Sequence, residues 1–147
     1  MPFAARLRIA ALLAALAALA PAAHAQLFRA YVAPTGSDAN PCTLPLPCRL
    51  LPAALTAVRA GGEVWMLDSA NYNTATVTID KSVSILAVPG VVGSVVATGG
   101  PAISIIATDA TVSLRNLVIA PLGVTGTHGV SVTGRARVDI EHCVITG

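Results

Sequence analysis

The C-terminal half of this 147-residue chain contains an internal repeat, which limits the possible folds more than any other feature. The segment HGVSVTGRARVDIEHCVITG (residues 128–147) follows the pattern of GPAISIIATDATVSLRNLVIA (residues 100–120) at a shift of about 26 to 27 residues. A fainter copy, TVTIDKSVSILA, occupies residues 76–87. Each copy alternates apolar and polar residues as β-strands do, and a polar residue, Asn116 or His142, marks a turn in the two clear copies.

Short strands at this period, without helices between them, favour a solenoid of β-coils. One coil cannot bury its own inward side chains and does so only against its neighbours, so equivalent residues should stack in columns such as Ile79, Ile105 and Val132. An antiparallel sandwich or barrel is the alternative, because it also spaces strands about 8 to 12 residues apart. The solenoid is favoured because a sandwich gives no reason for the register to repeat.

The first 25 residues have the features of a secretory signal peptide. Arg6 and Arg8 precede an uncharged apolar run (residues 9–23), and the small-x-small sequence AHA ends at Ala25. The run is shorter than the roughly 18 residues of a spanning helix, so a stable membrane anchor is the less favoured alternative. We therefore expect cleavage between Ala25 and Gln26 and a secreted or periplasmic mature protein.

The positive net charge of the sequence belongs to this leader. Its removal takes away two of the nine basic residues and leaves seven against seven acidic ones. The mature chain is therefore close to neutral, and its charge gives no support for a nucleic-acid partner or an anionic membrane.

Two cysteines, Cys42 and Cys48, lie in the segment NPCTLPLPC (residues 40–48), whose three prolines are incompatible with a helix or a central strand. Export places them in an oxidising compartment, so a disulfide is expected. Closing so short a loop stabilises a fold by about 2 to 2.5 kcal/mol in the chain-entropy model. A metal pair or a redox pair is the alternative, although the C-x-x-C spacing is absent.

Residues 50–60, LLPAALTAVRA, form the one helical pattern of the mature chain, with Pro52 in its first turn and Gly61-Gly62 after its end. Its apolar face comprises Leu51, Ala54, Leu55 and Val58. We expect this amphipathic helix to cap the first coil, with a partner-binding helix as the alternative. Short strands are expected on either side, over residues 28–33 and 63–68.

Several of these segments together resemble a family. They are GSDANPC (residues 36–42), the Pro-Cys that ends at Cys48, the alanine-rich helix, GGE (residues 61–63) and TIDKSVSI (residues 78–85). In this order they are similar to exported bacterial right-handed parallel β-helix repeat proteins with a pectin-lyase-like fold. The resemblance covers essentially the whole mature chain and implies an all-β, right-handed parallel β-helix with an N-terminal capping helix. It says little about activity, since one fold serves many functions.

These features and the resemblance together divide the chain into three regions: the signal peptide (residues 1–25), an N-terminal strand, disulfide loop and capping helix (residues 26–60), and parallel coils (residues 61–147). Such proteins usually run through more coils and a C-terminal cap. The inward residues of the last coil, Val130, Val132, Val138, Ile140 and Ile145, would therefore lack a partner on one side. We expect the chain to be a piece of a longer β-helix or to self-associate through this open coil.

The lyase branch of that superfamily has its site on the outer face of one parallel sheet, where carboxylates bind calcium and an Arg or Lys abstracts a proton. The outward positions of the first repeated column hold one carboxylate, Asp80, together with hydroxyl groups. A calcium site takes about 6 to 8 oxygen ligands, so neither a metal nor another cofactor is predicted. The candidate binding residues are Asp80, Ser104, Ser131, Thr133 and Arg135.

The remaining polar residues give weaker signals. Asp139 and Glu141 are two residues apart on one strand face, where acids usually serve solubility. His142 should fill the turn role of Asn116, and Cys143 should be a buried free thiol that packs as a small apolar residue. No catalytic motif is present, so no catalytic residue is predicted.

We therefore expect an exported β-helix protein whose surface binds polysaccharide or cell-envelope glycans, or is structural, without catalysis. The alternative is a fragment of a polysaccharide lyase or glycoside hydrolase whose catalytic residues lie on other coils.

Overall fold

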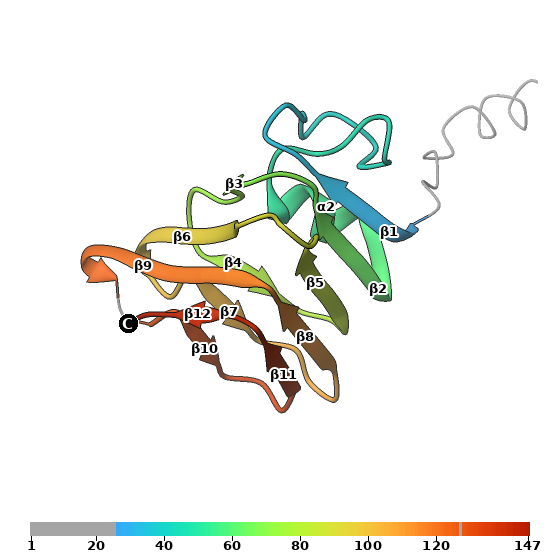
Figure 1. Ribbon diagram of the computed structural model, residues 1–147. Coiled ribbons are helices and arrows are strands. Elements are labelled where there is room, and N and C mark those ends of the chain that lie inside the picture. The colour runs from blue at the N-terminus through green and yellow to red at the C-terminus, as the bar shows by residue number, and fades with distance from the viewer. Residues whose placement is uncertain (1–25, 127) are drawn as a thin grey trace, which may run out of the picture.

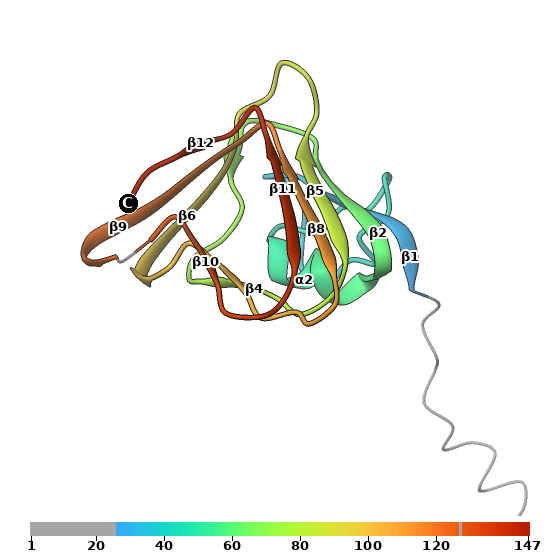
Figure 2. The same ribbon diagram turned by 90° about the horizontal axis from the view of Figure 1, so that it is seen from below.

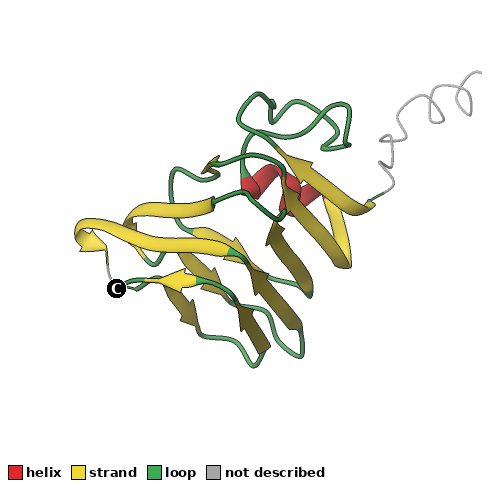
Figure 3. Cartoon of the chain, in the orientation of Figure 1, coloured by secondary structure: helices red, strands yellow, loops and turns green. Residues whose placement is uncertain are grey.

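The computed structural model describes residues 26–126 and 128–147 (Figure 1). The predicted signal peptide, with Ala25 on one side of the cleavage site, lies outside the described residues. The described chain is predominantly β structure with one short helix (Figure 3). Within it, no helix is long and apolar enough to cross a membrane.

The strands form three sheets, and every strand pair in the described residues is parallel. Sheet A contains, in spatial order, β1 (Leu27–Val32), β2 (Val58–Met66), β5 (Val83–Ala87), β8 (Thr111–Arg115) and β11 (Arg137–Glu141). Sheet B contains β3 (Ala70–Asn71), β6 (Gly93–Gly100), β9 (Leu117–Gly126) and β12 (Val144–Ile145). Sheet C contains β4 (Val77–Ile79), β7 (Ile103–Ile105) and β10 (Val130–Val132). The antiparallel alternative is therefore wrong.

From β2 onward the chain visits the sheets in a fixed rotation, A then B then C, and each passage through all three is called a coil below. Seen along the stack, the three sheets outline a triangle around a common interior (Figure 2). The apolar residues of alternating strands point into this interior because successive side chains of a strand face opposite sides.

The predicted columns are confirmed. Ile79 and Val132 both pair with Ile105, on opposite sides of it. In sheet A, Leu114 pairs with Ile85 and with Ile140. The repeat therefore sets the register in these two sheets.

The helix is shorter than predicted. Helix α2 spans Leu51–Ala57, with Pro52 in its first turn and Leu51, Ala54 and Leu55 buried. Val58 already has an extended backbone and begins β2, so the predicted helix end at residue 60 and the predicted strand start at residue 63 are both wrong. A β-branched residue that fills the core and pairs with Leu27 favours the strand. Gly61 does not end the helix but supplies a positive φ of 75° inside β2, next to an irregularity in the register.

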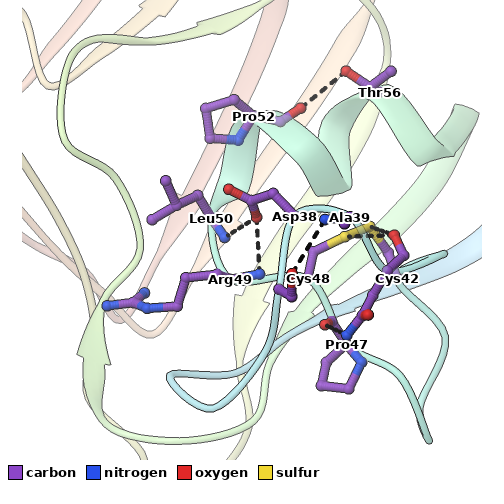
Figure 4. Close-up of a disulfide and its surroundings, with 11 residues drawn as sticks. Asp38, Ala39, Cys42, Pro47, Cys48, Arg49, Leu50, Pro52 and Thr56 are labelled. Atoms are coloured by element: carbon purple, nitrogen blue, oxygen red, sulfur yellow. Dashed lines mark hydrogen bonds between the residues drawn. A yellow bond between two sulfur atoms is a disulfide. The ribbon is translucent and has the colours of Figure 1, made fainter.

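The N-terminal end of the stack is closed by the disulfide loop (Figure 4). The predicted bond between Cys42 and Cys48 is present, with a Cα–Cα distance of 4.6 Å. The loop pairs with the outer edge of β1: Tyr31 donates its N–H to the Cys42 carbonyl at 2.8 Å and accepts from the Cys48 N–H at 2.9 Å. Helix α2 contacts β1, β2 and β4 from inside the same end.

Two further residues support this end. The Oδ1 atom of Asp38 accepts the N–H groups of Arg49 at 2.9 Å and Leu50 at 2.8 Å, immediately before α2. Tyr72 is fully buried, and its hydroxyl donates to the Asp68 carbonyl at 2.6 Å. Burial raises the pKa of Tyr72 above its ordinary value. The sequence pattern did not predict either role.

The two corners marked by Asn116 and His142 share a left-handed backbone, with φ of 56° and 53°. Asn116 Nδ2 donates to the carbonyls of Ala87 at 3.1 Å and Val91 at 3.2 Å, one coil earlier. Among the described residues the His142 side chain makes no such bond. The predicted equivalence therefore holds for the backbone and not for the side chain.

The C-terminal end is open in the described residues. The inward side chains of the last coil are 47% exposed at Val132, 44% at Ile140 and 40% at Ile145, whereas Ile105, Leu114 and Ile119 one coil earlier are fully buried. This matches the predicted lack of a partner on one side. Cys143, predicted to be buried, is a free thiol of intermediate exposure for the same reason.

Candidate functional site

The predicted binding residues lie on and beside the outer face of sheet C. Ser104 of β7 pairs with Thr78 of β4 on one side and with Ser131 of β10 on the other. Both serines are partly exposed. The structure thus brings a row of three hydroxyl side chains together, one on each strand.

The other predicted residues lie beyond the strand ends. Asp80, Thr133 and Arg135 are exposed in the segments that lead from sheet C to sheet A. The main chain of Thr133 bonds to Ile105 and that of Arg135 to Asp109, and these contacts fix the turns. Asp80 and Arg135 therefore lie at the rim of the hydroxyl row rather than within it.

A different group of side chains stands out on the outer face of sheet A. We call it the aromatic–ionic cluster and define it as Arg29 and Tyr31 of β1 with Glu63 and Trp65 of β2. Arg29 Nε donates to Glu63 Oε2 at 2.7 Å, and Trp65 Nε1 donates to the same oxygen at 3.1 Å. The Arg29 guanidinium lies over the Trp65 ring, with Cζ 4.0 Å from the centroid. Tyr31 meets Trp65 edge to face at a centroid distance of 6.3 Å.

This cluster is both ordered and accessible. The side chains of Arg29 and Glu63 are 36% and 27% exposed, and Tyr31 and Trp65 are also partly exposed. The hydrogen bond to Glu63 raises the pKa of Arg29 above its ordinary value, so the guanidinium stays charged. Arg29 Nε and Trp65 Nε1 both donate to Oε2, so Oε1 of Glu63 has no hydrogen bond to any described residue. A ligand hydroxyl has an acceptor there, beside an aromatic surface.

The cluster continues along the stack as two outward rows. One row contains Arg29, Glu63, Ser84, Ser113 and Asp139. The other contains Tyr31, Trp65, Leu86, Arg115 and Glu141. Adjacent strands are about 4.8 Å apart, so the rows repeat at that spacing over five strands. The Ser113 hydroxyl is buried within its row and has no described hydrogen-bond partner.

The salt bridges seen in the described residues all lie on this face. Besides the Arg29–Glu63 pair, Arg115 Nε is 3.0 Å from Glu141 Oε2 and Arg137 Nε is 3.2 Å from Asp139 Oδ2. The predicted carboxylate pair of β11 therefore shares one face, with each acid next to an arginine. Charge on this face is balanced locally, which suits a polar, uncharged or mixed ligand better than a polyanion.

A cleft of about 460 Å³ borders the second row at the corner between sheets A and B. Leu86 and Arg115 line it from the face, and Asn116 and His142 line it from the corner. Its volume is within the range of small-ligand sites. The outer face of sheet A therefore combines an aromatic surface at one end with a hollow at its side.

A second cleft, of about 750 Å³, lies between the disulfide loop and α2. Gln26, Asp38, Asn40, Ala53 and Ala57 are among its lining residues. Its one carboxylate, on Asp38, already bonds to the main chain. Asn40 and Thr56 also donate to main-chain carbonyls, of Pro47 and Pro52, so fewer polar groups are available to a ligand in this cleft than on sheet A.

Within the described residues, no group of three or more His, Cys, Asp or Glu side chains is placed to hold a metal ion. His128 lies in the exposed segment before β10. Neither it nor the half-buried Cys143 belongs to such a group within the described residues.

The sequence contained a signal for the aromatic–ionic cluster, but the residues that give it lie outside the repeat. The segments FRAYV and EVW alternate so that Arg29 and Tyr31, and likewise Glu63 and Trp65, point to one side. Their strands lie outside the repeat, and only the register of β1 on β2 brings the pairs together.

Comparison with protein-family models, curated proteins and solved structures found no match for this chain. The all-parallel sheets are compatible with a β-helix-like fold.

Proposed function

We propose that this chain is an exported, right-handed parallel β-helix protein of the pectin-lyase-like type that binds glycan without catalysis. The fixed rotation through three parallel sheets supports this architecture, with α2 as the cap of its first coil. The disulfide supports export, because such bonds persist in non-reducing compartments.

The observation that carries the binding function is the aromatic–ionic cluster. Sugars present a flat apolar face and a rim of hydroxyl groups. Trp65 and Tyr31 supply aromatic surface, and Arg29 and Glu63 supply charged hydrogen-bond groups at its edge. Trp, Tyr and Arg are also the side chains on which binding energy concentrates at interfaces.

The two outward rows on sheet A extend this surface along the stack, so an extended polymer could contact several strands in succession. Their strand spacing of about 4.8 Å is close to the length of one sugar ring in an extended polysaccharide. A polysaccharide bound along the stack would place successive sugar rings over paired positions of neighbouring strands, from Trp65 through Leu86 to Arg115. The cleft beside Leu86 and Arg115 gives room for a substituent or a branch.

The test uses Trp65, which is the single tryptophan of the sequence. Mature chain is titrated with soluble neutral glucans, polygalacturonate and peptidoglycan fragments, and the fluorescence of Trp65 is followed. A saturable change with one class is expected. Binding of that class by calorimetry should then weaken roughly tenfold or more in Trp65→Ala.

Phe28→Ala is the matched control, because Phe28 is an exposed aromatic residue on the neighbouring strand β1 but outside the cluster. Its affinity should match that of the unmodified chain. Absence of binding to every class, or equal loss in both variants, would remove the basis of the proposal. Release of unsaturated uronate or of new reducing ends would instead favour the lyase or hydrolase alternative, and loss of that release in Asp80→Ala would place the site beside sheet C.

A further inference from the structure

The cleft at the corner between sheets A and B has one wall made by the segment that joins β5 to β6, which projects at this corner (Figure 2). The Val91 N–H donates to the Val88 carbonyl at 3.1 Å, and Gly90 between them has a φ of 84°. Pro89 followed by a residue with positive φ is the pattern of a type II turn. The Val88 N–H also donates to the Met66 carbonyl at 3.1 Å. Main-chain bonds therefore hold this wall in place.

Two side chains at the cleft have hydrogen-bond donors that no described residue uses. Arg115 Nε lies 3.0 Å from Glu141 Oε2, but the two Nη groups of Arg115 have no hydrogen bond within the described residues. The imidazole of His142 is exposed and has none there either. Asn116 differs, because its amide already donates to carbonyls of the turn. The donors that a ligand can use are therefore a guanidinium and an imidazole.

The lining of the cleft combines this positive charge with an apolar surface. Among the described residues no acidic side chain lines it, and Glu141 lies outside it. Leu86, Ala87 and Pro89 supply the apolar part. A guanidinium binds a carboxylate through two parallel N–H bonds, and an apolar wall suits the carbon atoms beside it. The lining therefore fits a carboxylate that is attached to a small apolar group.

The cleft borders the glycan surface proposed above, so its ligand can be part of the same polymer. Trp65, Leu86 and Arg115 hold successive positions of one outward row. Arg115 is therefore two strands from Trp65, about 9.6 Å, which is close to the length of two sugar rings. A carboxylate on every ring would place one over Leu86, which offers no donor. An arm on alternate rings brings a carboxylate to Arg115 and none to Leu86.

We propose that the cleft binds the carboxylate of a lactyl ether carried by alternate sugars of the glycan, an arrangement found in the glycan strand of peptidoglycan. The carboxylate bonds to the Nη groups of Arg115 with His142 as a further donor, and the methyl group of the arm contacts Leu86 and Pro89. This inference rests on the proposed glycan binding and names the ligand class of that surface. Arg115 is then a specificity-determining residue.

The first experiment compares two glycans that differ in this arm. Chito-oligosaccharides and peptidoglycan strands of equal length, freed of their peptides by an amidase, share one backbone, and only the second carry lactyl ethers. Hydrogen bonds to a charged group are worth enough for a tenfold change in affinity. We therefore expect calorimetry to show at least roughly tenfold tighter binding of the lactyl-bearing strand. Equal affinity for both overturns the inference and leaves the proposed glycan binding standing.

Variants of two arginines test which donor gives the preference. Arg115→Ala should bring the two affinities within roughly twofold of each other, because the charged donor is lost. Arg137→Ala is the matched control, since Arg137 pairs with Asp139 on the same face but does not line the cleft, and it should keep the preference. Trp65→Ala should weaken both glycans and keep it too. A preference that survives in Arg115→Ala, or that disappears in Arg137→Ala as well, overturns the assignment.

A small probe tests the cleft in the unmodified chain, without the glycan. 2-Methoxypropionate has the ether, methyl group and carboxylate of the lactyl arm, and its methyl ester has the same arm without the charge. At constant pH, the acid should shift the side-chain NMR signals of Arg115 and His142, and the ester should not. Shifts with both probes or with neither contradict the site. Shifts with the acid but no binding of either glycan would overturn the glycan function and leave a site for a free carboxylic acid, so the two failures are distinct.

Discussion

At the N-terminal end of sheet A the edge of β1 exchanges hydrogen bonds with the disulfide loop, whereas at the C-terminal end the edge of β11 has no described neighbour. The interior differs in the same way. Leu51 of α2 is fully buried at one end, and Ile145 is 40% exposed at the other. Both ends continue the same apolar columns, so the difference shows that an inward-facing position is buried only when a layer lies on each side of it.

The largest expected effect compares two isoleucines of one column. Ile119 is fully buried in β9, and Ile145 pairs with it from β12. Ile119→Ala should lower the free energy of unfolding by about 2 to 5 kcal/mol, since a buried residue leaves a cavity. Ile145→Ala should cost about half as much or less. Urea denaturation at concentrations where the chain is monomeric measures both, and equal costs would show that the end is not open.

Removal of the disulfide tests how much the N-terminal closure contributes. Replacing Cys42 and Cys48 by serine should lower the free energy of unfolding by about 2 kcal/mol. Cys143→Ser is the matched control and should change it by less than about 0.5 kcal/mol, because that thiol is free at the open end. Thiol counting on the denatured, unreduced chain should find one reactive group, and a count of three would contradict the disulfide.

Asp38 offers a smaller probe of the same end. Asp38→Ala removes the acceptor of the Arg49 and Leu50 N–H groups and should cost roughly 1 to 2 kcal/mol. Asp80→Ala, at an exposed carboxylate with no described hydrogen bond, should cost less than about 0.5 kcal/mol. Thermal unfolding compares the two. Equal costs would mean that Asp38 does not hold the loop against the helix.

The smallest expected effect is the loss of the stability contribution of Tyr72 at alkaline pH. Burial raises the folded-state pKa of Tyr72, so the contribution of this group is fully present below its unfolded value of 10.0. It is lost as pH rises from 10.0 toward the folded pKa, because the unfolded chain releases the proton first. Tyr72→Phe should be less stable than the unmodified chain at pH 8 by about 1 kcal/mol, through the lost Asp68 bonds. The gap should narrow above pH 10, and a widening gap would reverse the sign of the shift.

The sequence predicted the repeated columns of sheets A and C, the disulfide and a helix before the coils, but it did not predict strand β6 or the contacts between β1 and β2. The columns through Ile105 and Leu114 follow from a period that recurs, and so does the corner at Asn116. Strand β6 was not predicted because two of its three inward positions, Gly93 and Ala97, are small, and a Cβ atom at Gly93 would clash with the Met66 side chain. Val95 is the one larger apolar residue among them and gives no alternating hydrophobic signal by itself.

The binding surface was missed for a related reason. Arg29 and Glu63 are 34 residues apart, and their contact depends on a register that includes an irregularity between β1 and β2. The helix end was wrong because tertiary pairing of Val58 overrode the helical pattern of residues 50–60. The predicted hydroxyl row on sheet C does form, because it follows the repeat, but Asp80 and Arg135 lie at its rim.

The corner at Asn116 has a consequence for how such a chain changes in length. Its side chain bonds to carbonyls of the preceding coil, and its backbone conformation recurs at His142, one period later. The last two coils thus turn from sheet A to sheet B at corners with the same backbone conformation, and each inner coil packs against the coils on both sides of it. Tandem duplication of one period would insert a coil and lengthen the outer face of sheet A by one strand, about 4.8 Å, while a single N-terminal closure serves a stack of any height.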